Sequence, residues 1–324
     1  MSNSPFFSII IPSRNRPVEL AAAVSSVLAQ DFSDCEVVIV DDGSTPPVEP
    51  GSLLPDNADG KERVRVVNLS FHLRGRGPGY ARNVGVWASK GRYVAFLDDD
   101  DIWTRQDYLS LAFKAVSAAS ADVFFANQEA ITTEGERRLL WLNALADVLA
   151  REKRAQQNEC YQVAVGDLIS AGGFSHLNTT IVRREFFDQL SGIDEYIRYE
   201  EDLDFYLRSI DAAGAILFHP GIVARHHVPD SSRQDNASTL VGKLQKMNTR
   251  LYLLNKNRLA ARDPAIVQYC QDYSASTLKH MTEYYLTQGD YPSARRWAAR
   301  ALAEKMSAKW ALYTVCLWMR SLFR

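Results

Sequence analysis

The chain has 324 residues, of which 46% are hydrophobic and 23% are charged. This composition is typical of a folded globular protein and excludes a disordered one. The 37 Lys and Arg residues nearly balance the 39 Asp and Glu residues, so the chain lacks the strongly basic character of dedicated nucleic-acid-binding proteins. Its length allows one large domain or two ordinary ones, with ample residues for a hydrophobic core.

The sequence carries neither a disulfide signature nor a membrane-spanning one. The four cysteines, Cys35, Cys160, Cys270 and Cys316, are widely separated and form no CxxC pair, which disfavours a disulfide framework or a cysteine zinc site. The N-terminus lacks a basic segment followed by a long apolar run, so we expect no signal peptide and a cytoplasmic protein. No apolar run is long enough to predict a spanning helix.

Short apolar, β-branched runs alternate with segments of helical periodicity between residues 6 and 130. This alternation predicts βαβ units, and hence an α/β fold with a mostly parallel, Rossmann-like sheet between layers of helices. The apolar runs are nearly continuous, as in strands buried on both faces. In chain order, we expect strands at 6–11, 36–40, 64–69, 93–97 and 123–126, and helices at 18–30, 79–89 and 108–120.

Beyond residue 130 the pattern changes twice. Residues 131–175 look irregular apart from a helix expected at 143–157, and a strand at 179–182, a helix at 202–213 and a strand at 215–219 follow, the last ending before Pro220. From Thr239 onward the pattern is entirely helical, at 240–261, 265–287, 291–305 and 308–323. We therefore expect a catalytic α/β domain over 1–235 and an all-helical C-terminal extension over 236–324.

Four consecutive aspartates, Asp98–Asp101, follow the fourth expected strand. Like charges this close raise one another's pKa and destabilise the fold unless a counter-charge neutralises them. Carboxylate oxygens suit Mg²⁺ and Mn²⁺, so the run predicts a divalent-cation site, with a solvated acidic loop as the alternative. An EF-hand is excluded because Trp103 and Leu109 stand where that loop needs Gly and Glu.

Two further segments have unusual charge. Six acidic residues lie between Asp194 and Asp204, and Asp202 among them falls in the first turn of an expected helix, where a carboxylate acts equally well as a helix cap or as a catalytic base. The segment 71–92 holds five cations, no acid and a glycine-rich stretch before a helix. Such a backbone can bind phosphate oxygens, although a flexible turn is the simpler interpretation. Together these features favour a metal-bound nucleoside diphosphate donor and an acceptor hydroxyl.

Five segments, in order, resemble the family 2 glycosyltransferases of the GT-A fold. They are FSIIIPSRNR at 7–16, VIVDDGS at 38–44, ARN at 81–83, GRYVAFLDDDDIW at 91–103 and EDLDFYLR at 201–208. The resemblance covers about residues 6–230 and leaves the C-terminal helices unmatched. It implies an inverting, metal-dependent hexosyltransferase that moves a sugar from a nucleoside-diphosphate sugar, expected to be a UDP-sugar, to an acceptor hydroxyl in bacterial cell-surface polysaccharide or glycan synthesis.

The resemblance also implies which residues contact the donor. Arg14 stands where many relatives carry an aromatic residue, so a guanidinium would stack on the nucleotide base, and Asp42 would accept a hydrogen bond from a base N–H. The implied nucleotide-sugar-binding residues are Pro12, Ser13, Arg14, Asp42, Arg82, Asn83, Asp98 and Asp99.

The acidic run would be the family's Asp-x-Asp element. In it, Asp100 would be the principal ligand of Mg²⁺ or Mn²⁺, and Asp98 would face the ribose or the metal. His227, which has the family's Arg-x-His spacing, would also reach the metal, and an ordinary packed or surface histidine is the alternative for it and for His226.

The pair Glu201-Asp202 would supply catalysis, with Asp202 as the general base that takes the acceptor proton in a single inverting displacement. The presence of Asp98, Asp100 and Asp202 disfavours a catalytically silent relative that binds a nucleotide sugar or a partner through its helical tail. A nucleotidyltransferase is disfavoured because the loop after the first strand lacks glycine. Residues 172–176 suit either an acceptor pocket or an ordinary loop.

The C-terminal segment 291–324 combines seven basic residues and one acid with interleaved aromatic residues. A basic, aromatic helix suits an anionic membrane interface, where a saccharide or lipid-linked acceptor would be met. Packing on the catalytic domain or on a second copy, in a homodimer, is the alternative. We expect the protein in the cytoplasm or peripheral at the inner face of the cell membrane, with no nucleic-acid partner.

Overall fold

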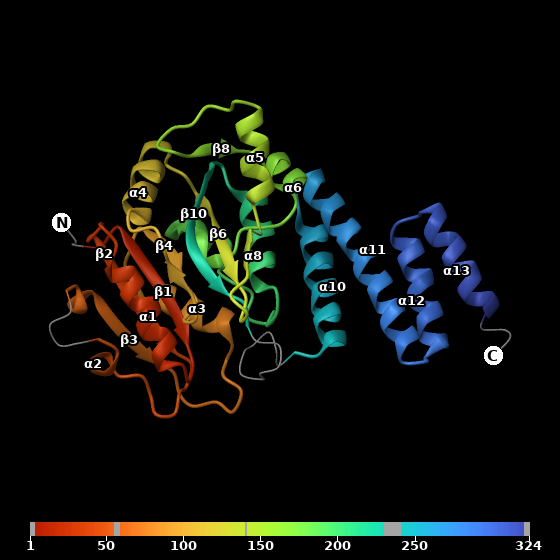
Figure 1. The fold of residues 1–324 in the computed structure, drawn as a ribbon, viewed down its shortest axis with the longest axis horizontal. Helices are drawn as coiled ribbons and strands as arrows, with labels where there is room; N and C mark the ends of the chain where they lie inside the picture. Colours follow the sequence, from red (N-terminus) through yellow and green to blue (C-terminus); the bar gives the residue numbers. More distant parts are fainter. Residues whose placement is uncertain (1–3, 55–58, 140, 230–240, 321–324) are drawn as a thin grey trace. The chain divides into compact units, whose positions relative to one another are not determined.

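The computed structural model describes residues 4–54, 59–139, 141–229 and 241–320. The chain divides into two compact units, Met1–Gln234 and Asp235–Arg324 (Figure 1). The first unit is built from strands and helices, and the described part of the second contains helices.

A ten-stranded, mostly parallel sheet forms the centre of the first unit, in the order β3-β2-β1-β4-β9-β6-β10-β5, with β7 paired to β6 and β8 to β10. Strands β3, β2, β1 and β4 run parallel to one another, as do β6 and β10, whereas β9 is antiparallel between β4 and β6. The strands are β1 (Phe7–Ser13), β2 (Cys35–Asp41), β3 (Val64–Asn68), β4 (Tyr93–Phe96), β5 (Ile102–Trp103), β6 (Val123–Ile131), β7 (Arg137–Leu139), β8 (Tyr161–Val163), β9 (Thr180–Arg183) and β10 (Ile216–His227).

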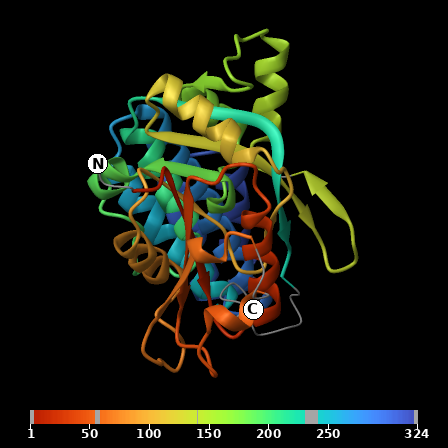
Figure 2. The same cartoon turned by 90° about the vertical axis from the view of Figure 1, so that its left-hand side faces the viewer.

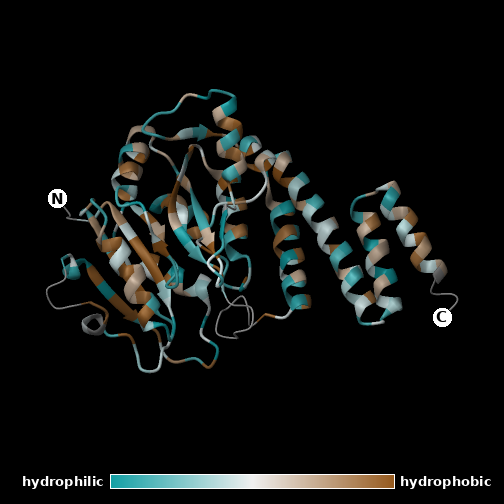
Figure 3. Ribbon diagram, in the orientation of Figure 1, coloured by the Kyte–Doolittle hydropathy of each residue, from teal (hydrophilic) through white to brown (hydrophobic). Residues whose placement is uncertain are grey.

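Alternate residues of β1 face two different helical layers. Ile9 and Ile11 share a buried cluster with Leu20 of α1, whereas Ile10 belongs to a second cluster with Ala81 of α3. Burial on both faces explains why the central strands carry apolar runs (Figure 3). The helices of this unit are α1 (Pro17–Leu28), α2 (Pro50–Leu53), α3 (Pro78–Ala88), α4 (Tyr108–Ala119), α5 (Asn143–Arg151), α6 (Val165–Ala171), α7 (Arg184–Gln189) and α8 (Glu201–Ala212).

Helix α3 lies unusually close to the sheet because Gly85 faces it. A Cβ atom at Gly85 would come within 2.4 Å of Cγ2 of Ile10 and 3.0 Å of Cγ2 of Val40, so a larger residue would push the helix away. This approach holds Arg82, which is 4% exposed, beside the loop that follows β4.

The strand expected to end before Pro220 does not end there, and that prediction is wrong. Strand β10 continues through Pro220 to His227. Proline cannot donate to the ladder, and the pairing of β10 with β6 accordingly shifts register after His219, as at a β-bulge. The continuation carries His226 and His227 to the acidic loop.

Residues 131–175 contain more regular structure than the sequence predicts. Strands β7 and β8 and helix α6 are additional, and the helix expected at 143–157 ends at Arg151. Both strands have three residues, which is too short for a periodic pattern to be detected. Figure 2 shows β7 returning along the end of β6.

The second unit contains α10 (Lys243–Ala260), α11 (Pro264–Thr287), α12 (Tyr291–Glu304) and α13 (Ala308–Arg320). Helix α11 packs against α10 and α12, and its Leu278 and Met281 share a buried cluster with Met247 and Ala301. The expected first residues at 240 and the expected end at 323 lie outside the described residues. Among the helices that the structure describes, none is both long and apolar enough to cross a membrane.

Candidate active site

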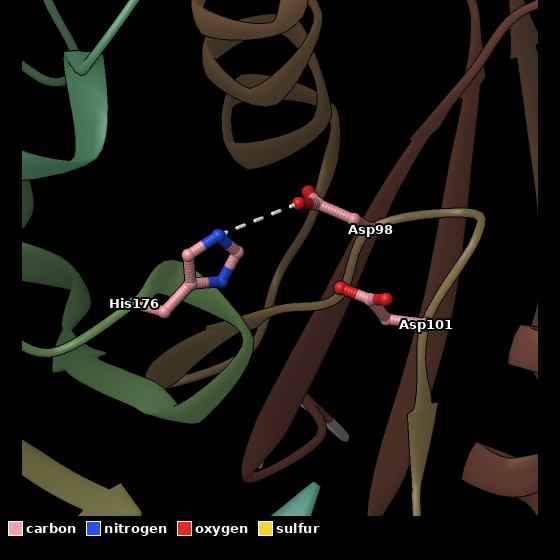
Figure 4. A group of neighbouring side chains, drawn as sticks. All are labelled: Asp98, Asp101 and His176. Atoms are coloured by element: carbon pink, nitrogen blue, oxygen red, sulfur yellow. Dashed lines mark ion pairs between the residues drawn. The ribbon is translucent and has the colours of Figure 1, made fainter. Parts of the chain in front are cut away.

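Asp98 meets groups from two other segments beyond the end of β4, helix α3 and the segment before β9. Figure 4 shows Asp98 and Asp101 on the loop that follows β4, facing His176 from the segment before β9. The backbone N–H of Asp98 donates to Oδ1 of Asn178 at 2.9 Å. Its carboxylate lies 2.5 Å from the Arg82 guanidinium and 4.0 Å from Nε2 of His176. The first aspartate of the run is therefore fixed by both its backbone and its side chain.

Arg82 links the acidic loop to the first turn of α8. One terminal nitrogen donates to Asp98, and the other donates to Oε1 of Glu201 at 2.8 Å. Burial would lower the pKa of Arg82, but the two carboxylates raise it above its usual value. The same guanidinium, together with His176, outweighs burial at Asp98 and holds that pKa below its usual range. The three groups thus form a charged bridge around a buried guanidinium.

The second and third aspartates face β1. Oδ2 of Asp99 accepts from the Ser13 hydroxyl at 2.8 Å, and Arg16 donates to Asp99 at 3.0 Å and to Asp100 at 2.8 Å. Burial raises the pKa of Asp99 to about 6 in spite of these partners. Burial and the neighbouring carboxylates raise the pKa of Asp100 to about 7. The two carboxylates of Asp99 and Asp100 thus share one cation, Arg16.

The fourth aspartate organises the two histidines of β10. Asp101 is fully buried, and its carboxylate lies 2.7 Å from Nδ1 of His226 and accepts from the backbone N–H of His227 at 2.7 Å. Asn178 donates to the same carboxylate. These partners outweigh burial and hold the pKa of Asp101 below its usual range. Burial would lower the pKa of His226, but its bond to Asp101 and the other aspartates raise it to about 9.

His176 joins the acidic loop to the expected catalytic base. Its Nε2 lies 3.8 Å from Oδ2 of Asp202 and 4.0 Å from Oδ2 of Asp98. Burial lowers the pKa of His176 to about 4, so the ring is neutral at pH 7. Burial and the adjacent Glu201 carboxylate raise the pKa of Asp202 to about 7. A carboxylate with such a pKa is suited to general acid–base catalysis.

Asp98, Asp101 and His176 form a possible metal site, because their ligand atoms lie within 4.8 Å of one another. Asp100 and His227 lie outside this group. Nδ1 of His227 is 2.6 Å from the backbone carbonyl oxygen of Asp100, so the expected ligand pair is adjacent to the group. The two carboxylates suit Mn²⁺ or Mg²⁺, whereas the imidazole is a ligand typical of transition metals.

The residues expected to bind the nucleotide base lie at the ends of β1 and β2. Asp42 accepts hydrogen bonds from the backbone N–H groups of Arg76 and Gly77 at 2.8 and 2.9 Å. Arg14 donates to the carbonyl oxygens of His72 and Leu73 at 2.8 and 3.2 Å. The glycine-rich segment is thereby held against the two residues expected to bind the base.

Two other residues of the expected donor set have different surroundings. Asn83 is buried and donates to the carbonyl oxygen of Ile193 and to Glu195 at 2.8 and 2.9 Å, so its amide fixes the segment before α8. Pro12 lies in β1 opposite Val40 of β2.

The sequence predicts Asp101 as a member of the acidic run that binds a cation, without a role of its own. It leaves His176 in a segment that suits either an acceptor pocket or an ordinary loop, and it indicates no role for Asn178. His176 and Asn178 lie in a segment with no periodic pattern, and an antiparallel strand, β9, inserts between β4 and β6 and brings them to the acidic loop. Their proximity therefore depends on sheet order, which local patterns do not specify.

Comparison with known families gives the same assignment as the geometry. The profile of the family described as "Glycosyl transferase family 2" matches residues 8–170, about half of the chain. The chain belongs to glycosyl transferase family 2. The resemblance seen in the sequence motifs is thus confirmed.

Two succinoglycan biosynthesis proteins of Rhizobium meliloti (strain 1021) are similar over 70% of this chain. ExoO is 28% identical over 234 residues, which cover 70% of this chain and 62% of ExoO. ExoW is 27% identical over 244 residues, covering 70% of this chain and 73% of ExoW. The chain thus spans less than two thirds of ExoO, and it spans 15% of an uncharacterized Rickettsia felis glycosyltransferase that is 40% identical over 96 residues.

Solved structures share the fold. S. aureus TarS 1-349 in complex with UDP-GlcNAc matches with a TM-score of 0.65 at 18% identity, over 92% of this chain and 81% of that chain. Another crystal structure of S. aureus TarS matches with a TM-score of 0.62 at 17% identity. This match covers 94% of this chain and 50% of that chain. The mostly parallel sheet between helices is therefore the GT-A fold expected from the sequence, followed by a helical region.

Proposed function

We propose that this chain transfers a sugar, with inversion, from a UDP-sugar to an acceptor hydroxyl in bacterial cell-surface polysaccharide synthesis. The position of Asp202 carries the proposal. The pKa of this carboxyl is raised to about 7, and His176 alone among the groups named above lies between it and Asp98 of the acidic loop. The names of ExoO and ExoW support a polysaccharide product, and the TarS complex with UDP-GlcNAc supports a UDP-linked donor.

In this reaction, Asp202 accepts the proton of the acceptor hydroxyl. The acceptor oxygen forms a bond to the anomeric carbon while the bond from that carbon to the diphosphate oxygen breaks, and its electron pair leaves with the nucleoside diphosphate. His176 stays neutral beside Asp202 and adds no charge that would lower the basicity of this carboxylate. Arg82 neutralises Glu201, which would otherwise repel the ionised base.

We propose that Asp98, Asp100 and His227 hold the divalent cation and that Asp101 positions the histidines. Both carboxylate oxygens of Asp101 already have hydrogen-bond partners. Asp100 instead has a pKa raised to about 7 by burial and by its neighbours' charge, so a cation would relieve repulsion there. When bound, Mg²⁺ or Mn²⁺ would stabilise the charge that develops on the diphosphate.

A thermal-shift screen tests the donor assignment on the full chain with Mn²⁺ and UDP, GDP, ADP or dTDP. We expect UDP to raise the melting temperature most, since a ligand of the folded state stabilises it. Incubation with radiolabelled UDP-sugars then measures release of UDP and transfer to octyl glycosides. No stabilisation by any nucleoside diphosphate would contradict donor binding, and UDP binding without turnover would identify a catalytically silent relative.

We also propose that α13 lies on an anionic membrane surface. Leu312, Val315 and Met319 are 67, 54 and 50% exposed and share one face of the helix at helical spacing. On the same helix, the exposed Lys309 lies three residues before Leu312, and the preceding helix α12 carries the exposed Arg296 and Arg300. Apolar residues flanked by cations match an anionic bilayer interface, where a lipid-linked acceptor would lie.

Co-sedimentation of the full chain with phosphatidylglycerol or phosphatidylcholine vesicles tests this contact. Wild type should pellet with the anionic vesicles, and less so at high salt. A variant with Leu312→Ser, Val315→Ser and Met319→Ser should remain in solution, whereas the control Leu259→Ser, at an 85% exposed leucine of α10, should pellet. Equal sedimentation of all forms, or a dimer that the triple variant dissociates, would contradict the membrane proposal.

A further inference from the structure

Three aromatic rings from three segments of the chain meet beside Asp202, the proposed general base. The ring centroid of Trp141 lies 6.0 Å from that of His176 and 5.7 Å from that of His226, and the two histidine rings are 5.2 Å apart. His176 faces Asp202, as described above. The His176 side chain therefore lies between Trp141 and the carboxylate of Asp202, which would take the acceptor proton.

The backbone around Trp141 is held in an unusual conformation. Its φ of +65° is in the left-handed region, which a bulky L-residue rarely adopts without a compensating reason. Across from it, Gly173 has a φ of +77°, and a Cβ there would come within 2.7 Å of the Trp141 carbonyl oxygen. Glycine thus allows the His176 loop to pack tightly against the Trp141 backbone, which positions the indole ring at the site.

Trp141 and the residues expected to bind the nucleotide base lie on opposite sides of β4 in the sheet. The residues expected to bind the nucleotide base, among them Arg14 and Asp42, lie at the ends of β1 and β2, on one side of β4 in the sheet. Trp141 follows β7, which pairs with β6, and contacts a histidine of β10, so it belongs to the strands on the other side of β4. A sugar bound against Trp141 would therefore approach Asp202 from the side away from the nucleotide.

We propose that Trp141 is an acceptor-binding residue, against whose indole the C–H face of the acceptor sugar ring stacks. This inference rests on the proposed function. A pyranose ring has an apolar C–H face and polar hydroxyl edges. Asp202 and His176 suit the hydroxyl edges, whereas the partly exposed Trp141 supplies apolar ring surface. Stacking would hold the acceptor ring while one hydroxyl reaches Asp202.

The kinetic test compares Trp141→Leu and Trp141→Phe with Trp87→Leu, a control at a 66% exposed tryptophan of α3. The probes are octyl β-D-glucoside, octyl β-D-galactoside and octyl N-acetyl-β-D-glucosaminide. We expect Trp141→Leu to raise the acceptor KM about tenfold, as for loss of one aromatic contact, with kcat and UDP affinity nearly unchanged. Trp141→Phe, which keeps a ring, should show a smaller increase. An acceptor KM for Trp141→Leu equal to that of Trp87→Leu would overturn the proposal.

Saturation-transfer NMR with the same octyl glycosides separates this inference from the transfer reaction, because it needs no turnover. Wild type should transfer saturation to the sugar ring C–H protons, and Trp141→Leu should lose that signal while Trp87→Leu keeps it. If wild type binds the glycosides through Trp141 but transfers no sugar, the proposed function fails and the binding role stands. Identical spectra for wild type and Trp141→Leu would overturn the binding role.

Discussion

Arg82 of α3 donates a 2.8 Å hydrogen bond to Glu201 of α8, although 119 residues separate them in the chain. The same guanidinium pairs with Asp98. The acidic loop and helix α8, which carries the proposed base, are thus joined through one buried cation, and this predicts that stability and activity share a dependence on Arg82.

Replacing Arg82 by Met should lower the free energy of unfolding by about 3–5 kcal/mol, because it leaves buried carboxylates without their partner. Arg82→Lys keeps the charge but loses the two-pronged geometry, so it should be intermediate. Urea unfolding measures both, with Arg74→Met, at an exposed arginine, as a control that should change little. Equal stability of Arg82→Met and Arg74→Met would show that the bridge contributes nothing.

The rate of transfer should rise with pH and level off above neutrality. Asp202 must be ionised to accept a proton, and its pKa is raised to about 7, so kcat should fall about tenfold per pH unit below that value. Initial rates between pH 5 and 9 at saturating donor and acceptor provide the profile. A flat profile down to pH 5 would contradict the assignment of Asp202 as base.

The raised pKa of Asp202 also predicts that the folded wild type becomes less stable as pH rises, whereas its transfer rate increases. Since folding raises the pKa of Asp202, ionising it favours the unfolded chain, and its contribution to stability is lost as pH rises from about 4 through 7. Asp202→Asn cannot ionise, so its stability relative to wild type should increase over that range, by about 1.4 kcal/mol for each pH unit that separates the folded and unfolded pKa values. Denaturant unfolding at pH 5 and pH 8 measures the difference, and a constant difference would contradict the raised pKa.

Mn²⁺ should bind more tightly at pH 8 than at pH 6, because Asp100 must lose its proton, with a pKa of about 7, before it ligates. Electron paramagnetic resonance titration measures free Mn²⁺ directly. Asp98→Asn and Asp100→Asn should each weaken binding strongly, whereas Asp188→Asn, at an exposed site, should not. Weakening by Asp101→Asn but not by Asp100→Asn would instead favour the group of Asp98, Asp101 and His176.

The sequence predicts the fold well wherever periodicity is strong. Strand β2 has a continuous apolar run from Val37 to Val40, and helix α1 repeats its buried residues at helical spacing, so both lie within a few residues of their expected bounds. The prediction fails at Pro220, because strand pairing outweighs the local preference of proline through a register shift.

The site is predictable to the extent that it lies within short motifs. Motifs place Asp98–Asp101 and the Glu201-Asp202 pair at the ends of expected elements. They contain no information on which residue from a distant segment fills the space between them. His176 comes there because β9 inserts antiparallel between β4 and β6, and Trp141 because a short β7 returns along β6. Such contacts follow from strand order, which one sequence does not determine.

The central claim is that Asp202 acts as the base in sugar transfer from a UDP-sugar. Its most direct test measures, on Asp202→Asn and wild type, both UDP-sugar affinity by calorimetry and the rate of sugar transfer, with Asp188→Asn as the matched control. We predict UDP-sugar affinity within about twofold of wild type and a transfer rate lower by about 10²–10⁴-fold for Asp202→Asn. Transfer by Asp202→Asn at the wild-type rate would contradict the claim.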